Sequence, residues 1–202
     1  MLSDFGPLPL EAAIHCMRGA LRGLEYLHAN GVVHCDMKPH NILLGSDGVC
    51  KIADFGSSIN IATKKVVATI SSAADESDAY DSQSTNMDDD GGGGGGANHE
   101  VARGTALYMS PEACRGIEGE KPSDIWGLGI TFIELLTGHV PWGRVKDVHR
   151  FIANLGSHER CMAPRIPAEF GEEISQLIAS CLERDPEKRP TATSLLASPL
   201  FL

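Results

Sequence analysis

The sequence of 202 residues has no hydrophobic run that approaches the ~18–20 residues a membrane-spanning helix needs. Its start has neither a basic cluster nor a long apolar stretch, so we expect no secretory signal peptide. The six cysteines are scattered without a CxxC pair, which argues against a zinc site and favours reduced thiols in a cytoplasmic or nuclear protein. With 42% hydrophobic and 22% charged residues, the composition is that of a globular protein with one sizeable core.

Lysine and arginine are missing from residues 71–100, which hold eight acidic residues and the glycine run 91–96. The stretch has no apolar periodicity, so it cannot bury enough surface to offset its ordering entropy. We predict a disordered insert there. The glycine run matches a phosphate-binding GxGxxG pattern only trivially, because no apolar strand precedes it. The rest of the chain has 17 basic and 19 acidic residues, and this near-neutral balance predicts no nucleic-acid or membrane partner.

Apolar residues recur at three- and four-residue steps between Pro9 and Asn30, which predicts an amphipathic helix of about 20 residues. Residues 124–137 are apolar almost all round and are followed by a glycine, which predicts a buried central helix. Short β-like runs and two or three further helices are also expected. The runs are 32–33, 42–44 and 49–52, with a turn at 45–48, and the helices fall within 145–155, 171–183 and 191–198.

A cluster of polar residues between the β-like runs carries the chemistry. Asp36, Lys38 and Asn41 precede one run, and Asp54 follows the next. Each alone is a weak signal, since a single Asp is more often a turn residue. Together on adjacent loops they supply a carboxylate to deprotonate a hydroxyl, a cation for a moving phosphate, and oxygen ligands for Mg²⁺. No GxSxG, HExxH or paired Cys/His spacing supports a hydrolase or metalloprotein instead.

These residues belong to a longer series of motifs that resembles the C-terminal lobe of a eukaryotic protein kinase. The series covers positions 5–198 in the family's order. Its members are the HxDxKxxN loop at 34–41, Asp54-Phe55-Gly56, an APE-type Ser110-Pro111-Glu112, a DxWxxG helix at Asp124, and Arg184-Asp185-Pro186 with Arg189-Pro190. The implied fold is α+β and mostly α, with a small β-hairpin in the catalytic region.

The subclass follows from Lys38 two residues after Asp36 and from the run 104–112, which resemble serine/threonine kinases rather than tyrosine kinases. The start of the chain and the segment 23–28 are similar to MAP kinase kinase kinases. The His-Cys-Asp variant is most similar to a plant branch of that group.

The resemblance implies a function and a set of roles. The expected reaction is transfer of phosphate from ATP, with Mg²⁺, to a protein serine or threonine in a signalling cascade, where the substrate could be a downstream kinase. Asp36 is the expected catalytic base and Lys38 the contact to the transferred phosphate. Asn41 and Asp54 would hold Mg²⁺, and Thr105 would bond near Asp36 and shape the hydroxyl site.

Other motif residues are implied to be structural. Glu112 and Arg189 would form a buried ion pair, and Asp124 would order the catalytic-loop backbone. The remaining positions with an expected structural role are His34, Phe55 and Gly56.

Two departures from the family pattern stand out. No glycine-rich loop and no strand lysine precede the first long helix, so we expect the N-terminal lobe to be absent and the chain alone to have little activity. Cys35 occupies the position of the arginine that meets an activation-loop phosphate, and a thiol cannot make that charge-assisted bond. A non-catalytic, pseudokinase-like binding module or a truncated fragment therefore stays open as an alternative.

Overall fold

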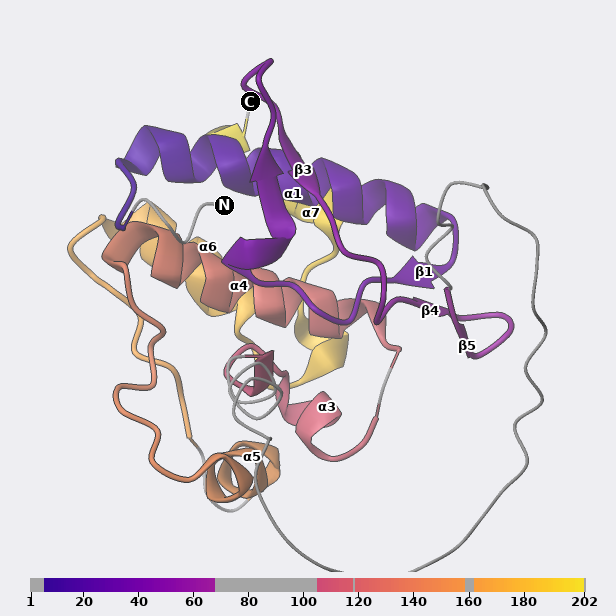
Figure 1. The fold of residues 1–202 in the computed structure, drawn as a ribbon. Helices are drawn as coiled ribbons and strands as arrows, with labels where there is room; N and C mark the ends of the chain where they lie inside the picture. The colour runs from indigo at the N-terminus through magenta and orange to yellow at the C-terminus, as the bar shows by residue number, and fades with distance from the viewer. Residues whose placement is uncertain (1–5, 68–104, 118, 159–161, 202) are drawn as a thin grey trace, which may run out of the picture.

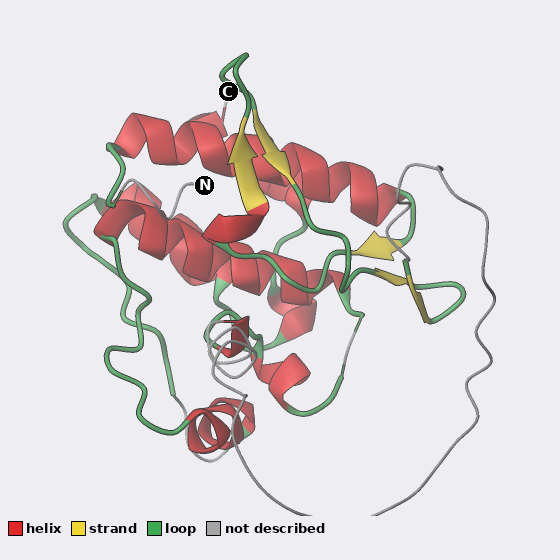
Figure 2. Ribbon diagram, in the orientation of Figure 1, coloured by secondary structure: helices red, strands yellow, loops and turns green. Residues whose placement is uncertain are grey.

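The structure is a computed structural model that describes residues 6–67, 105–117, 119–158 and 162–201. Helices dominate, and the strands are short (Figure 2). The predicted insert at 71–100 lies outside the described residues. The elements in chain order are α1 (Leu10–Ala29), β1 (Val32–Val33), η2 (Pro39–Asn41), β2 (Ile42–Leu44), β3 (Cys50–Ile52), β4 (Ile59–Asn60), β5 (Lys65–Val66), α3 (Pro111–Cys114), α4 (Lys121–Thr137), α5 (Val148–Gly156), α6 (Glu172–Cys181), η3 (Pro186–Lys188), α7 (Ala192–Leu196) and η4 (Pro199–Phe201).

Helix α1 confirms the expected helix between Pro9 and Asn30. Pro9 lies at its N-cap, where a missing N–H costs nothing. At the other end, Asn30 caps the helix through its backbone N–H and through a side-chain bond to the carbonyl of Tyr26 at 2.8 Å. Gly31 follows with φ of 70°, a conformation that suits a residue without a Cβ.

Helix α4 is the buried centre of the molecule, as its apolar sequence predicts. It begins three residues earlier than expected, with Pro122 in its first turn, and ends at Thr137, with Gly138 as its C-cap. Gly138 adopts a left-handed φ of 75° and donates its N–H to the carbonyl of Glu134 at 2.7 Å. The side chains of Trp126 and Phe132 are fully buried.

The two long helices lie side by side in opposite directions (Figure 1). Leu8, just before α1, donates its N–H to the carbonyl of Leu135 near the end of α4 at 2.7 Å. At the opposite ends, His28 of α1 meets Asp124 of α4 at 2.8 Å. Helices α6 and α7 add apolar side chains to the core, as does α5 through Phe151 and Leu155.

Two small sheets accompany the helices. Strands β2 and β3 form an antiparallel hairpin with Ile42 opposite Ile52, and this hairpin lies against α1 (Figure 1). Strand β1 pairs with β4, which pairs with β5. The hairpin was predicted from the sequence. Strands β4 and β5 and the short α3 were not, because each of these strands has only one apolar residue and α3 is a single turn.

Glycines on α1 let the hairpin approach closely. A Cβ at Gly19 would clash with the carbonyl oxygen of Cys50 and lie 2.9 Å from the Cys50 Cβ. A Cβ at Gly23 would instead meet the flexible Cδ1 of Ile52 at 2.8 Å. The two positions therefore differ in how easily their neighbours can move.

We predict that Gly19→Ala lowers the free energy of unfolding by about 1–3 kcal/mol, because the backbone of β3 would have to shift. Gly23→Ala is the matched control. It should be close to neutral, because a small movement of Ile52 is offset by the ~1 kcal/mol gain in helix propensity. Urea unfolding of both variants measures the difference, and equal midpoints would show that β3 is not held against α1 as described.

Candidate active site

Four of the predicted site residues form one hydrogen-bonded cluster. Lys38 Nζ donates to Asp36 Oδ2 at 2.6 Å and to Thr105 Oγ1 at 3.0 Å. Asn41 Nδ2 donates to the Asp36 backbone carbonyl at 2.7 Å and to Asp36 Oδ2 at 3.0 Å. Thr105 is thus connected to Asp36 by the Lys38 amine, which donates a hydrogen bond to each of them. The lysine and aspartate side chains are only 15% and 11% exposed, so their charges attract each other more strongly than in water.

The cluster borders a cavity of about 340 Å³. Asp36, Ser57, Thr105 and Tyr108 are among its lining residues. Asp36 Oδ1 accepts no hydrogen bond from the described residues, although it is buried. A buried acceptor without a donor is costly, so this oxygen is the natural place for a hydroxyl of a bound molecule.

Strand register places Asn41 opposite Ala53, the residue before Asp54. Because Ile42 lies opposite Ile52, the residues just outside the hairpin also meet, and Ala53 donates its N–H to the Asn41 carbonyl at 2.9 Å. Asp54 comes next, is exposed, and adopts a left-handed φ of 64°. Its Oδ1 accepts the Gly56 N–H at 3.2 Å.

The side-chain oxygens of Asn41 and Asp54 are of the type that binds Mg²⁺. The amide nitrogen of Asn41 is engaged with Asp36, so its amide oxygen is the atom that can face a cation. Amide and carboxylate oxygens are hard ligands, and Mg²⁺ is usually bound by one or two such groups together with phosphates and water. Within the described residues no cluster of three His, Cys, Asp or Glu could hold a metal by itself, so a cation here would need oxygens from its ligand.

His34 is fully buried and connects the catalytic loop to the segment before Asp54. The geometry fits a ring with its proton on Nε2, donating to the Ala53 carbonyl at 3.0 Å, while Nδ1 accepts the Asp36 N–H at 3.3 Å. Phe55 approaches the His34 ring edge-on, with centroids 5.4 Å apart. These contacts join the loop 34–41 to the segment around Phe55.

Asp124 lies directly beneath the catalytic loop and is 1% exposed. Its Oδ2 accepts the backbone N–H of His34 and the Nε2–H of His28, both at 2.8 Å. Its Oδ1 accepts the backbone N–H of Cys35 at 2.8 Å. Cys35 has a φ of 66°, which is unfavourable for a residue with a Cβ, so these bonds hold a strained backbone.

His28 is the site residue that sequence reasoning missed. The structure buries the polar His28 on α1 and leaves its apolar neighbour Leu27 partly exposed. The signal was present in the spacing, because Leu21, Leu24 and His28 follow three- and four-residue steps. A polar side chain at a core position needs a buried partner, and here that partner is Asp124.

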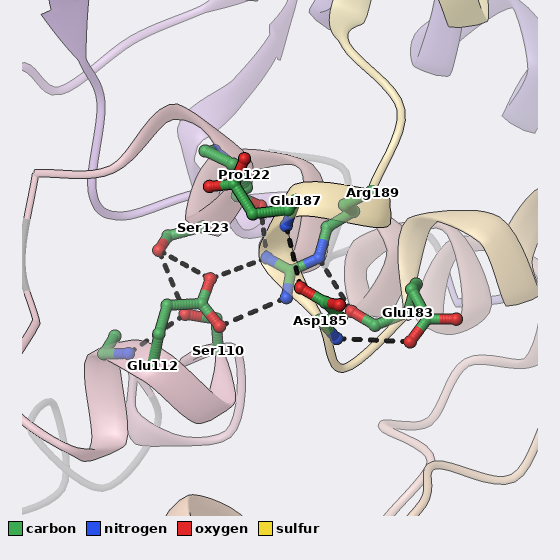
Figure 3. A network of polar contacts seen from close by, with 9 residues as sticks. Ser110, Glu112, Pro122, Ser123, Glu183, Asp185, Glu187 and Arg189 are labelled. Atoms are coloured by element: carbon green, nitrogen blue, oxygen red, sulfur yellow. Dashed lines mark hydrogen bonds and ion pairs between the residues drawn. The ribbon is translucent and has the colours of Figure 1, made fainter.

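Glu112 and Arg189 form the expected buried ion pair (Figure 3). Arg189 Nη1 donates to Glu112 Oε1 at 2.6 Å and Nη2 donates to Oε2 at 3.1 Å, which is a bidentate arrangement. The guanidinium also donates to the carbonyls of Pro122 and Glu183, and Ser123 donates to Glu112 at 3.0 Å. The pair therefore joins α3, α4 and the segment before η3.

The charges of this pair are mutually stabilised. Burial by itself would raise the pKa of Glu112, but hydrogen bonds and charge attraction from Arg189 outweigh it and hold the pKa below its ordinary value. Arg189 also lies over the Trp126 ring, with its guanidinium carbon 5.3 Å from the centroid. Glu112 is consequently ionised in the folded chain at neutral pH.

The motif geometry described above is that of a protein kinase, and residues 1–201 match the protein kinase domain family. The chain belongs to this family. It is 31% identical to mitogen-activated protein kinase kinase kinase 17 and 32% identical to mitogen-activated protein kinase kinase kinase ANP1, both from Arabidopsis thaliana. It is also 33% identical to germinal center kinase 3 from Caenorhabditis elegans.

These alignments include 98%, 100% and 98% of this chain but only 45%, 26% and 30% of the respective relatives. The chain therefore spans less than half the length of each. The similarity to serine/threonine kinases, and to MAP kinase kinase kinases in particular, confirms the interpretation drawn from the motifs. The expected absence of an N-terminal lobe is not confirmed by it.

We predict that Glu112→Gln lowers the free energy of unfolding by about 3–5 kcal/mol, because it leaves the Arg189 charge buried without its partner. Lys188→Gln is the control. Lys188 contacts Asp185 at 3.3 Å but is 72% exposed, so its loss should change stability by no more than about 0.5 kcal/mol. Urea unfolding at neutral pH measures both, and equal losses for the two variants would contradict the assigned role of the pair.

The same pair predicts a pH dependence. The folded-state pKa of Glu112 is below the ordinary value of 4.5, so between the two values the unfolded chain binds more protons at this site. The stabilisation is complete above about pH 4.5 and is lost as pH falls through the folded-state pKa. As pH falls through this range, the free energy of unfolding of the unmodified chain should therefore decrease more steeply than that of Glu112→Gln.

Proposed function

We propose that the protein transfers the terminal phosphoryl group of ATP to serine or threonine hydroxyls of protein substrates. The observation that supports this most strongly is the Asp36–Lys38–Thr105 cluster beside the cavity, with one Asp36 oxygen free of partners among the described residues. This arrangement provides a hydroxyl acceptor and a cation within one small volume.

Asp36 is the proposed base. Its Oδ2 is fixed by Lys38 and Asn41, which orients Oδ1 to accept the proton of a substrate hydroxyl. Lys38 stabilises the Asp36 carboxylate before a substrate binds. Its amine can also contact a phosphate oxygen as negative charge develops on that oxygen. Thr105 restricts the position of the Lys38 amine and borders the space a hydroxyl would enter.

Asn41 and Asp54 are the proposed Mg²⁺ ligands. When bound, ATP–Mg²⁺ supplies the phosphoryl group and neutralises its charge. The protein's part would be to hold the Asn41 amide oxygen and the Asp54 carboxylate on adjacent loops, and the pairing of Asn41 with Ala53 supports this. The Gly56 N–H fixes the orientation of the Asp54 carboxylate.

The similarity to MAP kinase kinase kinases favours a downstream kinase as the protein substrate. We propose a place for the protein in a cytoplasmic or nuclear signalling cascade, where cysteines remain reduced. In the described part of the chain, no helix is both long and apolar enough to cross a membrane.

A non-catalytic binding module is the alternative. Large apolar side chains are exposed on α1 and on the hairpin, including Tyr26 at 70% and Leu44 at 53%. Such surface is typical of a site that another protein segment covers. In that case the residues of the kinase motifs would make structural contacts only and would take no part in phosphoryl transfer.

The decisive experiment measures phosphate transfer from ATP to a serine/threonine peptide mixture by the longest natural form of the protein that contains this chain. Asp36→Asn should lower turnover by roughly 10²-fold or more, because it removes the base. Asp54→Asn should abolish most Mg²⁺-dependent turnover.

Asp47→Asn is the matched control, because Asp47 is an exposed carboxylate at the tip of the same hairpin. It should leave turnover unchanged, and all three variants should melt near the temperature of the unmodified protein. Undetectable transfer by the unmodified protein, with Mg²⁺ and ATP present, would favour the binding module. Full activity of Asp36→Asn would refute the assigned chemistry.

A further inference from the structure

Two buried thiols from distant parts of the sequence lie in contact. Cys16 is on the buried face of α1 and Cys50 begins β3, and their Sγ atoms are 2.9 Å apart. The residues are 3% and 2% exposed. Nothing in the proposed phosphoryl transfer uses either residue.

The close packing of α1 and β3 forces this contact. Gly19 is one helical turn after Cys16, and its missing side chain lets the Cys50 backbone lie against the helix. Gly23, one turn further, does the same for Ile52. Because Cys50 is fixed by pairing with Leu44 in the hairpin, its thiol has little freedom to move away from Cys16.

We propose that Cys16 and Cys50 are a site of oxidative modification, forming an intrachain disulfide when the protein meets a peroxide. One thiol, as its thiolate, attacks the peroxide, giving a sulfenic acid and water. The second thiol displaces the hydroxyl from that sulfur, forming the S–S bond and a second water. In total, two thiols are oxidised by two electrons, and one hydrogen peroxide is reduced to two waters.

The geometry is close to what the product requires. A disulfide has an S–S bond of about 2.05 Å, so the sulfurs must approach by less than ~1 Å. Burial raises the pKa of Cys16 to about 12, so the thiolate is scarce and the pair stays reduced until a small neutral oxidant is abundant.

The disulfide would enclose the catalytic loop. The closed ring runs from residue 16 to residue 50 and contains all of 34–41. It would fasten β3, which leads into Ala53 and Asp54, to the helix that carries His28. The expected consequence is a chain that resists unfolding, because the crosslink removes freedom from the unfolded state.

Mass spectrometry of the peroxide-treated chain tests this inference independently of any kinase activity. After free thiols are blocked, trypsin with a protease that cleaves before aspartate should place Cys16, Cys35 and Cys50 in separate peptides, 4–18, 23–35 and 47–51. We expect peptides 4–18 and 47–51 to be linked, with the loss of two hydrogens, and to separate after treatment with dithiothreitol.

Melting temperature provides the second readout. Oxidation should raise it by several degrees, reversibly, in the unmodified chain and in Cys181→Ser, which removes a buried thiol elsewhere on α6. Cys16→Ala should lose the shift. Linkage through other cysteines, conversion of either thiol to a sulfinic acid without linkage, or an unchanged melting temperature of the linked chain would overturn the proposal.

Discussion

The position of the loop 34–41 depends on the hydrogen bonds that the Asp124 carboxylate accepts. This carboxylate lies in the first turns of α4 and accepts three hydrogen bonds, two from the backbone of His34 and Cys35 and one from His28. A buried charge is tolerated only when its lone pairs are satisfied, and here the donors come from the loop that must be held. The requirement to satisfy one carboxylate thus fixes the position of the catalytic loop relative to the helical core.

A second network continues from the same turn of α4. Ser123, next to Asp124 in the sequence, donates to Glu112, and Glu112 pairs with Arg189. The Pro122 carbonyl accepts from the same guanidinium. The first turn of α4 is therefore the meeting point of the catalytic loop, the segment around α3 and the C-terminal helices. Hydrogen bonds, and not apolar packing alone, therefore connect the loop 34–41 with the buried Glu112–Arg189 pair at this turn.

Much of this architecture was predictable from the sequence. The periodicity around Met17 and Leu24 gives α1, the apolar run through Trp126 gives α4, and the turn at 45–48 gives the hairpin. The resemblance to kinases placed Asp36, Lys38, Asn41 and Thr105 together, and the structure brings them within hydrogen-bonding distance. Local pattern and motif order were sufficient here because each element is long or chemically distinctive.

Other features depend on three-dimensional contacts that the sequence does not display. The partnership of His28 with Asp124 joins residues 96 positions apart, and the contact of Cys16 with Cys50 arises only from the packing of α1 against β3. Strands β4 and β5 have two residues each and form only through strand pairing, β4 with β1 and β5 with β4. The left-handed backbone of Cys35 likewise opposes local preference and is held by the hydrogen bond from its N–H to Asp124.

Amide hydrogen exchange in Asp124→Asn tests most directly whether this carboxylate holds the catalytic loop. Hydrogen bonds to a charged acceptor are worth about 1.5–3 kcal/mol, so the amides of His34 and Cys35 should exchange roughly 10–10²-fold faster in the variant. Amides in the middle of α1 and α4 report on global folding and should keep their protection. Unchanged exchange at His34 and Cys35, with the helices equally protected, would show that the loop is held by other contacts and would contradict the account.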